Sequence, residues 1–187
     1  MSNDRRQLRR EMRRRRRQLS PGERRRAAQR LARRLRASTL LYRARRVALY
    51  LPADGEIDPW PALLRGSGDR QCYLPVLDPL RPGFLRFAPW CPGQPMGANR
   101  FGIPEPRFRY SELAAPWSLD LILMPLVAWD RRGNRLGMGG GFYDRTLAGL
   151  EHRPVRPRLA GVAYRFQEVA ELESRWWDVP LDAVLTD

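Results

Sequence analysis

A glycine-rich segment with charged neighbours contains the residues best suited to chemistry. Four of the five residues from 137 to 141 are glycine, and Arg135, Asp144 and Arg145 flank them. Glycine tolerates positive φ angles and has no Cβ atom, so consecutive N–H groups can point into one concavity. A helix that began directly after the segment would add roughly half a positive charge at its N-terminus. We therefore predict an anion site here, suited above all to phosphate.

Two well-known phosphate-binding motifs do not fit this segment. No Gly-Lys-Ser/Thr sequence closes it, as a Walker A loop requires, and Phe142 stands where a dinucleotide-binding motif has its third glycine. A tight strand-to-helix turn, in which the glycines only relieve steric crowding, is the alternative interpretation. The flanking charges favour a phosphate site, because guanidinium groups pair with phosphate oxygens and a carboxylate beside phosphate needs a cation such as Mg²⁺.

The elements around the segment are predicted to be a strand and a helix. Residues 119–129 form an apolar run typical of a buried strand, and residues 142–150 can continue as a helix. Residues 46–51 predict another buried strand, which ends at a turn that carries the carboxylates Asp54 and Glu56. Ligands bind at such strand ends in open α/β sheets, so this turn is a second candidate for the site.

Two arginine-rich helices are expected before the first strand. Residues 5–19 contain no helix breaker and only a sparse apolar stripe, Leu8 and Met12. A capping box at 20–23, with proline at the first helical position, starts the second helix. The apolar side of this helix should pack on the body of the protein, and it consists of Ala27, Ala28, Leu31, Ala32 and Leu35.

The remaining elements alternate between strands and helical links. Short strands are predicted at 71–76, 83–88, 158–164 and 183–186, a short helix capped by Asp58 at 58–64, and a helical or irregular link at 166–172. Residues 89–106 are rich in Pro and Gly and predict either a mobile loop over a site or a plain surface connection. This order predicts a three-layer α/β fold with a largely parallel sheet. We expect a single domain, residues 1–187, with 1–38 as an N-terminal helical segment packed on the catalytic body.

The composition narrows the class of protein. Only two cysteines occur, Cys72 and Cys91, and no apolar signal region opens the sequence, so we expect a cytoplasmic protein with reduced thiols. No apolar run has membrane-spanning length. The single histidine, His152, lies in a polar stretch and is expected to be solvated. A Ser-His-Asp triad or zinc chemistry is therefore not expected.

The net charge of +15 is concentrated at one end of the chain. Residues 1–46 contain 19 arginines and three acidic residues, whereas the remaining residues contain 16 arginines and 17 acidic residues. The arginine runs are either a solvated helix face or an anion-binding surface. An arginine-rich nucleic-acid-binding protein is the chief alternative function, because a dense arginine helix binds polyanions almost irrespective of sequence. No nucleic-acid recognition motif is recognisable, so we expect no specific nucleic-acid partner.

Four segments of the sequence, in chain order, carry a family resemblance. They are Asp-Gly-Glu-Ile at 54–57, Gly-Ile-Pro-Glu-Pro at 102–106, Arg-Leu-Gly-Met-Gly-Gly-Gly-Phe-Tyr-Asp at 135–144 and Asp-Val-Pro-Leu-Asp at 178–182. Together they resemble the 5-formyltetrahydrofolate cyclo-ligase (methenyltetrahydrofolate synthetase) family. The resemblance implies a fold similar to the sugar-phosphate isomerase and CoA-transferase group. A sugar-phosphate isomerase itself is not expected, because isomerisation needs neither an ATP loop nor metal-binding aspartates.

The resemblance also implies an activity and its ligands. The implied reaction is the ATP-dependent cyclisation of 5-formyltetrahydrofolate to 5,10-methenyltetrahydrofolate, with release of ADP and phosphate and with Mg²⁺ as the metal. The formyl oxygen on N5 is too poor a leaving group for N10 to expel directly. Phosphorylation of that oxygen gives an imino-phosphate, which N10 attacks as phosphate leaves. Such a reaction needs alignment, arginines and Mg²⁺ more than a nucleophilic side chain. We further expect a monomer and no membrane partner.

The resemblance assigns roles to residues of this chain. The implied ATP contacts are Arg5, Arg6, Gln7, Leu8, Arg9, Arg135, Leu136, Gly137, Met138, Gly139, Gly140, Gly141, Phe142 and Tyr143. The implied folate contacts are Leu51, Glu56, Met138, Gly139, Gly140, Gly141 and Phe142. Asp144 and Asp178 are the implied Mg²⁺ ligands. We expect the charge that acts on the γ-phosphate to come from Arg135 and Arg145, the candidate catalytic residues, or from the N-terminal arginines. Some relatives carry basic residues where this chain has Met138 and Gly140, and Trp177 replaces a histidine before the terminal aspartate.

Overall fold

The computed structural model describes residues 3–63 and 69–187. The helices are α1 (Asn3–Gln18), α2 (Pro21–Ala37), α3 (Thr39–Arg43) and α4 (Phe142–Leu147). The strands are β1 (Arg46–Ala48), β2 (Gln71–Leu77), β3 (Leu85–Trp90), β4 (Met96–Ala98), β5 (Pro104–Pro106), β6 (Leu121–Pro125), β7 (Ala128–Trp129), β8 (Arg135–Leu136), β9 (Arg158–Ala163) and β10 (Ala183–Thr186). Short 3-10 helices lie at Trp60–Ala62, Tyr110–Glu112, Pro116–Ser118, Leu150–His152 and Arg165–Gln167.

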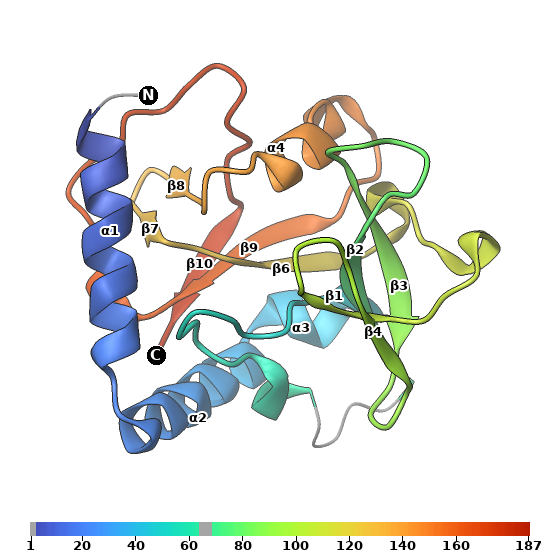
Figure 1. Cartoon of the computed structure of the whole chain (residues 1–187), viewed down its shortest axis with the longest axis horizontal. Helices are drawn as coiled ribbons and strands as arrows, with labels where there is room; N and C mark the ends of the chain where they lie inside the picture. Colours follow the sequence, from blue (N-terminus) through green and yellow to red (C-terminus); the bar gives the residue numbers. More distant parts are fainter. Residues whose placement is uncertain (1–2, 64–68) are drawn as a thin grey trace.

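A six-stranded sheet in the order β10-β9-β6-β1-β2-β3 forms the centre of the molecule (Figure 1). All neighbouring strands in it run parallel except β3, which pairs antiparallel with β2 at the edge. Side chains alternate between two apolar clusters along β6: Leu121 and Leu123 enter one, and Ile122 and Met124 enter the other. Since both faces of the sheet are buried, the predicted three-layer α/β fold with a largely parallel sheet is confirmed.

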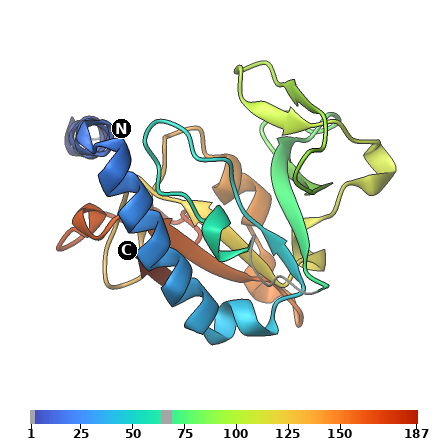
Figure 2. The same ribbon diagram turned by 90° about the horizontal axis from the view of Figure 1, so that it is seen from below.

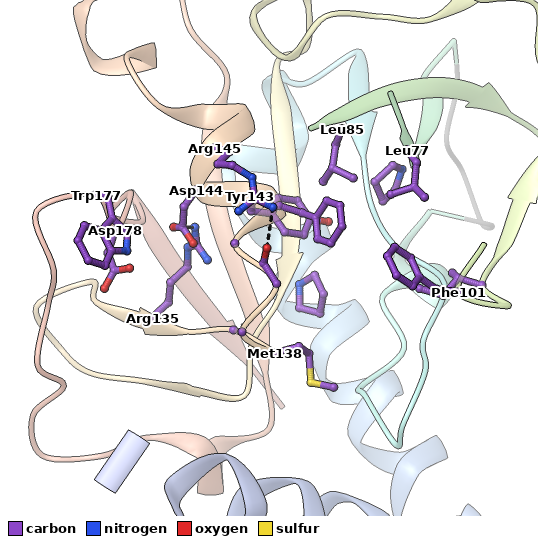
Figure 3. Close-up of a pocket in the computed structure, with 18 of the residues that line it drawn as sticks. Leu77, Leu85, Phe101, Arg135, Met138, Tyr143, Asp144, Arg145, Trp177 and Asp178 are labelled. Atoms are coloured by element: carbon purple, nitrogen blue, oxygen red, sulfur yellow. Dashed lines mark hydrogen bonds and ion pairs between the residues drawn. The ribbon is translucent and has the colours of Figure 1, made fainter. Parts of the chain in front are cut away.

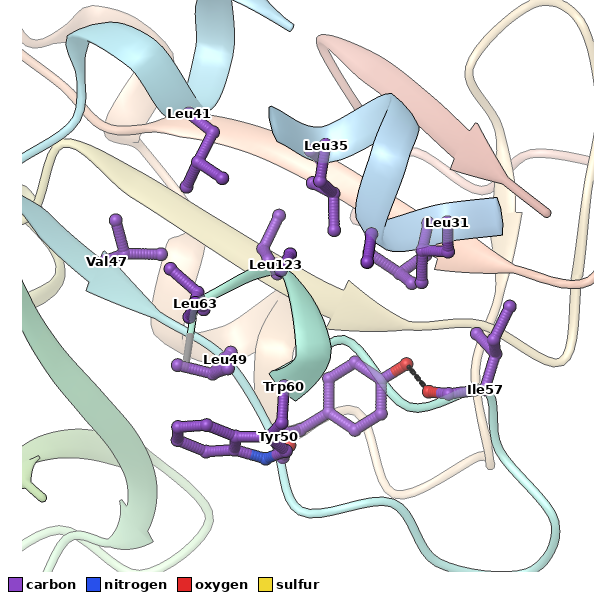
Figure 4. Packing of buried hydrophobic residues seen from close by; sticks show 14 of the residues in the cluster. Leu31, Leu35, Leu41, Val47, Leu49, Tyr50, Ile57, Trp60, Leu63 and Leu123 are labelled. Atoms are coloured by element: carbon purple, nitrogen blue, oxygen red, sulfur yellow. Dashed lines mark hydrogen bonds between the residues drawn. The ribbon is translucent and has the colours of Figure 1, made fainter. Parts of the chain in front are cut away.

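Helices α2 and α3 cover one face of this sheet. A capping box between Ser20 and Glu23 starts α2 as predicted, and its whole predicted apolar side is buried. Leu31 and Leu35 of α2 pack with Leu123 of β6 in the larger core cluster (Figure 4). Each such side chain contributes roughly 1.5–3 kcal/mol by its removal from water. This packing, rather than helix propensity, holds the arginine-rich helix α2 on the domain.

The other face is covered by α4 and the 3-10 helix that follows it, through Leu147 and Leu150. The predicted helix over 142–150 is shorter than expected, because Gly149 adopts a left-handed φ of 76° and separates the two helical pieces. Among the residues described, no helix is both long enough and apolar enough to cross a membrane.

Several predicted boundaries differ from the structure. The apolar run 119–129 contains two strands, because β6 ends at Pro125 and β7 then forms a hairpin with β8 before the glycines. The first strand, predicted at 46–51, stops at Ala48. The predicted helix at 58–64 is a single 3-10 turn, in which Asp58 accepts a hydrogen bond from the Trp60 N–H at 2.9 Å. Leu64 lies outside the described residues. The predicted strand 83–88 begins at Leu85 and continues to Trp90.

The Pro/Gly-rich segment 89–106 is also more regular than predicted. It contains the antiparallel hairpin β4–β5, which stands away from α1 and α2 in the view of Figure 2. The side chain of Asn99 accepts hydrogen bonds from the N–H groups of Phe101 and Ile103 at 2.9 and 3.1 Å and so closes the turn between the two strands. This local side-chain bonding gives the turn a defined shape.

Candidate active site

A cavity of about 510 Å³ lies beside residues 137–141, called the glycine loop below (Figure 3). One side of this main cavity is charged, and its residues are Arg5, Arg9, Arg135, Asp144, Arg175 and Asp178. The other side is mainly apolar, and its residues include Pro75, Leu77, Leu85, Phe101, Ile103 and Phe142, together with Asn99 and Glu105, which bond to each other at 2.8 Å. The cavity therefore has a charged half and an apolar half, with the glycine loop between them.

The backbone of the glycine loop has the conformations that only glycine adopts easily. Gly139 has φ of 103° and Gly141 has φ of 65°, and both angles lie in the left-handed region. A Cβ atom on Gly140 would lie 2.9 Å from the ring of Phe142. Helix α4 begins directly after the loop, as predicted, although the strand before it is β8 of a short hairpin and not the long buried strand.

Helix α1 brings two arginines to the charged half. The Nε–H of Arg9 donates to the carbonyl of Gly137 at 2.8 Å, and Arg5 pairs with Asp178 at 3.3 Å. Desolvation lowers the pKa of Arg9, and the nearby cations Arg5 and Arg175 lower it further. Nη1 of Arg9 is buried and has no hydrogen-bond partner within the described part of the chain. A cluster of cations with an unpaired donor attracts an anion.

The two aspartates in the charged half are each paired with an arginine. Asp144 accepts a hydrogen bond from Arg135 at 2.5 Å, and Asp178 accepts one from Arg5 at 3.3 Å. Within residues 3–63 and 69–187, no group of three or more His, Cys, Asp or Glu side chains could hold a metal ion. Mg²⁺ in phosphate-transfer sites is commonly bound by one or two carboxylates together with phosphate oxygens and water. Asp144 and Asp178 fit that kind of site and would act with a phosphate ligand.

Arg145 lines the main cavity but is engaged with the backbone. Its Nε–H donates to the Gly83 carbonyl at 2.9 Å and its Nη2–H to the Gly140 carbonyl at 2.6 Å. Arg145 therefore braces the glycine loop against the β2–β3 turn. Arg135 has a different environment, because it is buried and its Nε–H has no partner among the described residues. Of the two candidate catalytic cations, Arg135 is therefore the one with a buried N–H group that a ligand could bind.

Several predicted ligand contacts lie outside the main cavity. Arg6 and Gln7 are exposed on α1, Leu8 packs in a small apolar cluster, and Leu136 is fully buried beneath the glycine loop. These residues are near the site in sequence but do not line the cavity. The physical reason is helix periodicity, since only every third or fourth residue of α1 faces the domain.

Leu51 and Glu56 are also separated from the main cavity. Leu51 packs against the larger core cluster, and Glu56 lines a second concavity of about 990 Å³ between α2 and residues 52–61. Burial raises the pKa of Glu56, although the Ala53 N–H and the charge of Arg16 act in the opposite direction. Desolvation also raises the pKa of Tyr143, and the negative charge of Glu56 adds to this effect. The structure thus brings the charge of Glu56 close to Tyr143, which lines the main cavity.

Sequence reasoning missed two arginines of the site. Arg175 lines the charged half beside Trp177, with its Cζ atom 5.2 Å from the centre of the indole ring. Arg16 is fully buried and bonds to Asp54 at 2.8 Å. No feature of the sequence distinguishes Arg175, whereas Arg16 lies one helical turn after Met12 and so continues the apolar stripe of α1.

Comparisons with known proteins identify the family of this chain. The model of the 5-formyltetrahydrofolate cyclo-ligase family matches residues 1–187. A 5-formyltetrahydrofolate cyclo-ligase of Escherichia coli (strain K12) is 40% identical over 177 residues, which is 94% of this chain and 96% of that protein. The enzyme of the same name from Haemophilus influenzae is 43% identical over 144 residues, which is 76% of this chain and 75% of the relative.

Solved structures agree with this relationship. The NMR structure of Aquifex aeolicus 5,10-methenyltetrahydrofolate synthetase has a TM-score of 0.80 at 32% identity, covering 97% of this chain and 88% of the other. The Mycoplasma pneumoniae 5,10-methenyltetrahydrofolate synthetase has a TM-score of 0.75 at 25% identity, covering 98% and 99%. Fold, sequence motifs and relatives agree along the whole length of the chain. The chain therefore belongs to the 5-formyltetrahydrofolate cyclo-ligase family of enzymes.

Proposed function

We propose that this protein uses ATP to convert 5-formyltetrahydrofolate to 5,10-methenyltetrahydrofolate, with release of ADP and phosphate. The observation that carries the proposal is the two-sided main cavity, in which the glycine loop separates a charged half from an apolar half. A triphosphate suits the first half and the folate ring system suits the second. The names of the relatives agree with the folate substrate and the methenyl product.

The charged half supports binding of the ATP phosphates. Arg5, Arg9, Arg135 and Arg175 all line it, and the buried Nη1 of Arg9 and Nε of Arg135 have no protein partner in the part of the chain that the structure describes. An anion that accepts hydrogen bonds from these donors would remove the cost of leaving them unsatisfied. The positive φ of Gly139 lets the loop backbone approach the phosphates closely.

In this proposal Asp144 and Asp178 hold Mg²⁺ together with the phosphates. The bound metal would neutralise charge that develops on the transferred phosphoryl group. The arginine partners bond to Oδ1 of Asp144 and to Oδ2 of Asp178, so the other oxygen of each carboxylate could bind the metal. Arg135 and Arg5 would then stay beside the phosphate oxygens.

The apolar half supports binding of the folate ring system. Phe101 lies edge-on to Phe142 with 6.0 Å between the ring centres, and Leu77 and Leu85 lie nearby on the same side (Figure 3). Leu51 and Glu56 remain proposed folate contacts together with loop residues 138–142. Glu56 lines the second concavity, but its charge acts on Tyr143, which lines the main cavity, so we propose its pterin contact beside Tyr143.

The proposed chemistry uses positioned charge. The formyl oxygen attacks the γ-phosphorus of ATP and ADP leaves; N10 then attacks the formyl carbon, the carbon–oxygen bond breaks, and phosphate departs as N10 loses its proton. The protein's part is alignment and charge stabilisation by the arginines of the charged half. His152 is exposed, as predicted, and does not line the main cavity. A cytoplasmic location and a monomeric state remain predictions.

The test is the absorbance rise of 5,10-methenyltetrahydrofolate when the protein is mixed with 5-formyltetrahydrofolate and Mg-ATP. We expect turnover only when both ATP and Mg²⁺ are present, with one ADP formed for each product molecule. Product formation without ATP, or ATP hydrolysis without product, would contradict the proposal. An EDTA-treated sample that regains activity with Mg²⁺ serves as the control.

A further inference from the structure

Arg16 is a buried cation that makes contacts with three separate segments. Its side chain is 1% exposed, and Nη2 donates to Oδ2 of Asp54 at 2.8 Å. Nη1 donates to the Leu126 carbonyl at 3.3 Å and lies 3.6 Å from a carboxylate oxygen of Glu56. The sulfur of Met138 lies 4.0 Å from Nη2. A buried arginine is costly unless its partners require it, so these contacts point to a specific role.

The position of Arg16 on α1 relates it directly to Arg9. The two residues are separated by two helical turns, so both point to the same side of α1 at about 10 Å along its axis. Arg9 donates to the carbonyl of Gly137, and Arg16 contacts the side chain of the next residue, Met138. One helix face therefore touches two consecutive residues of the glycine loop.

The turn that carries Glu56 is packed against the end of the same helix. A Cβ atom on Gly55, which has φ of 75°, would lie 2.9 Å from the backbone carbonyl oxygen of Arg16. Asp54 pairs with Arg13 at 2.7 Å, with Arg16 at 2.8 Å and with Arg17 at 2.7 Å. The turn is thus held close to α1 by backbone contact and by ion pairs. Arg16 contacts both this turn, through Asp54, and the glycine loop, through Met138.

We infer that Arg16 is a positioning residue that joins the turn bearing Glu56 to the glycine loop, so that folate binding depends on it. This inference rests on the proposed function. Arg16 would keep the Glu56 carboxylate oriented and charged and would keep Met138 in place. Arg5 and Arg9, nearer the start of the same helix, line the charged half of the main cavity, which Arg16 does not line. Loss of Arg16 should therefore affect folate far more than ATP.

The surroundings of Glu56 make its charge dependent on this contact. The titratable and charged groups that act on it from the neighbouring elements are Arg13, Arg16, Asp54, Tyr50 and Tyr143. Burial and Asp54 favour the neutral carboxyl, whereas the Ala53 N–H, Arg16 and Arg13 favour the carboxylate. Without Arg16 the pKa of Glu56 should rise, because only the Ala53 N–H and Arg13 then offset its burial.

The experiment compares Arg16→Met with Arg17→Met. Arg17 is the matched control, because it also pairs with Asp54 on the same helix, but its side chain is 57% exposed where that of Arg16 is 1% exposed. We expect Arg16→Met to raise the KM for 5-formyltetrahydrofolate about ten-fold or more, with the KM for ATP changed less than about three-fold. The acid limb of the kcat/KM profile for folate should also move to higher pH. Equal effects of the two variants, or equal effects on both substrates, would overturn the inference.

A second pair of variants keeps the test valid if Arg16→Met does not fold. Arg16→Lys retains the positive charge but lacks the planar guanidinium group, whose several N–H donors reach different partners. On our inference it raises the folate KM in the wild-type background but adds little in a Glu56→Gln background, whereas additive effects would contradict the coupling. If the wild-type protein makes no methenyl product, the proposed function is wrong, whatever the role of Arg16. Calorimetric titration with 5-formyltetrahydrofolate then tests Arg16, and equal affinities of wild type and Arg16→Lys would refute its role.

Discussion

Nη2 of Arg135 lies 2.5 Å from Oδ1 of Asp144, so charged residues on opposite sides of the glycine loop are bonded to each other. Both side chains line the main cavity, and the Asp144 carboxylate also accepts a hydrogen bond from the Val179 N–H at 3.3 Å. The ion pair closes the base of the loop, and the hydrogen bond from Val179 links Asp144 to the C-terminal segment. Both hydrogen bonds use Oδ1 of Asp144, so Oδ2 could bind a metal while Arg135 stays in place.

The first prediction concerns this pair. Asp144→Asn keeps the size of the side chain but removes the charge that would hold Mg²⁺. Activity should fall by roughly two orders of magnitude or more and recover partly at high Mg²⁺. The measurement is the initial rate against Mg²⁺ concentration, with Glu151→Gln, an exposed carboxylate outside the main cavity, as the control. An unchanged Mg²⁺ dependence would remove Asp144 from the metal site.

The glycine loop supplies the second prediction. Gly139→Val should abolish ATP binding, because valine resists a φ of 103° and its side chain would extend toward Arg9, whose Cζ lies 3.7 Å from where the Cβ atom would be. Gly93→Val is the matched control, because Gly93 also has positive φ but has open space around it. Both variants should lose about 1–2 kcal/mol of stability. Calorimetric titration with ATP should show lost affinity in Gly139→Val alone.

The third prediction separates the inward and outward arginines of α1. Replacing Arg5 and Arg9 together by glutamine should raise the KM for ATP at least about ten-fold and reduce its dependence on salt. Replacing the exposed Arg10 and Arg14 together removes the same charge from the same helix and should change the KM for ATP little. If both double variants behaved alike, diffuse helix charge rather than contact would explain ATP binding.

The fourth prediction concerns Glu56. A carboxylate can accept the two adjacent N–H groups of a pterin, and a neutral amide accepts them less well. Glu56→Gln should therefore raise the KM for 5-formyltetrahydrofolate by roughly ten-fold or more, which corresponds to about 1.5–3 kcal/mol, and should leave the KM for ATP nearly unchanged. Steady-state kinetics with both substrates varied provides the measurement. An unchanged folate KM would show that Glu56 serves only the packing of its turn.

The fifth prediction concerns stability and pH at Asp130. This buried carboxylate accepts hydrogen bonds from Arg132, Asn134 and Leu172. Burial alone would raise its pKa, but these hydrogen bonds lower it overall. The stabilisation is therefore present above the unfolded-state pKa of about 3.9 and is lost as pH falls through the lower folded-state value.

At neutral pH, Asp130→Asn should cost about 1–3 kcal/mol, because the amide NH₂ must face an N–H donor. The difference from wild type should shrink as the pH falls below about 4. Urea unfolding at several pH values provides the measurement, with the exposed Glu171→Gln as the control. A difference that persists unchanged at low pH would show that the side chain acts by shape and not by charge.

Much of the fold could be predicted from apolar periodicity. The capping box and the buried side of α2 follow local rules, and the buried strands follow from continuous apolar runs. The errors lie where side chains or prolines act on the backbone. Pro125 interrupts an apolar run that looks continuous, and Asn99 makes a defined turn in a segment that looks irregular.

The candidate site was predictable where its residues are contiguous in sequence. The glycine loop and Asp144 line one cavity because the chain carries them there together. The arginines of α1 were harder to predict. The predicted ATP contacts 5–9 span more than one helical turn, and only Arg5 and Arg9 among them face the cavity. The position of Glu56 depends on tertiary packing between its turn and α1, and no local pattern encodes that packing.

The bond between Arg5 and Asp178 joins residues 173 positions apart, and it affects when a newly made chain acquires its site. Domains form from the N-terminal side during synthesis, at roughly 5–20 residues per second. Helix α1 therefore leaves the ribosome many seconds before the segment that carries Asp178. Until that segment arrives, Arg5 lacks its carboxylate partner and the charged half lacks Arg175 as well. An interrupted translation product that already contained five of the six sheet strands would still lack Arg175 and Asp178 and so would have an incomplete charged half.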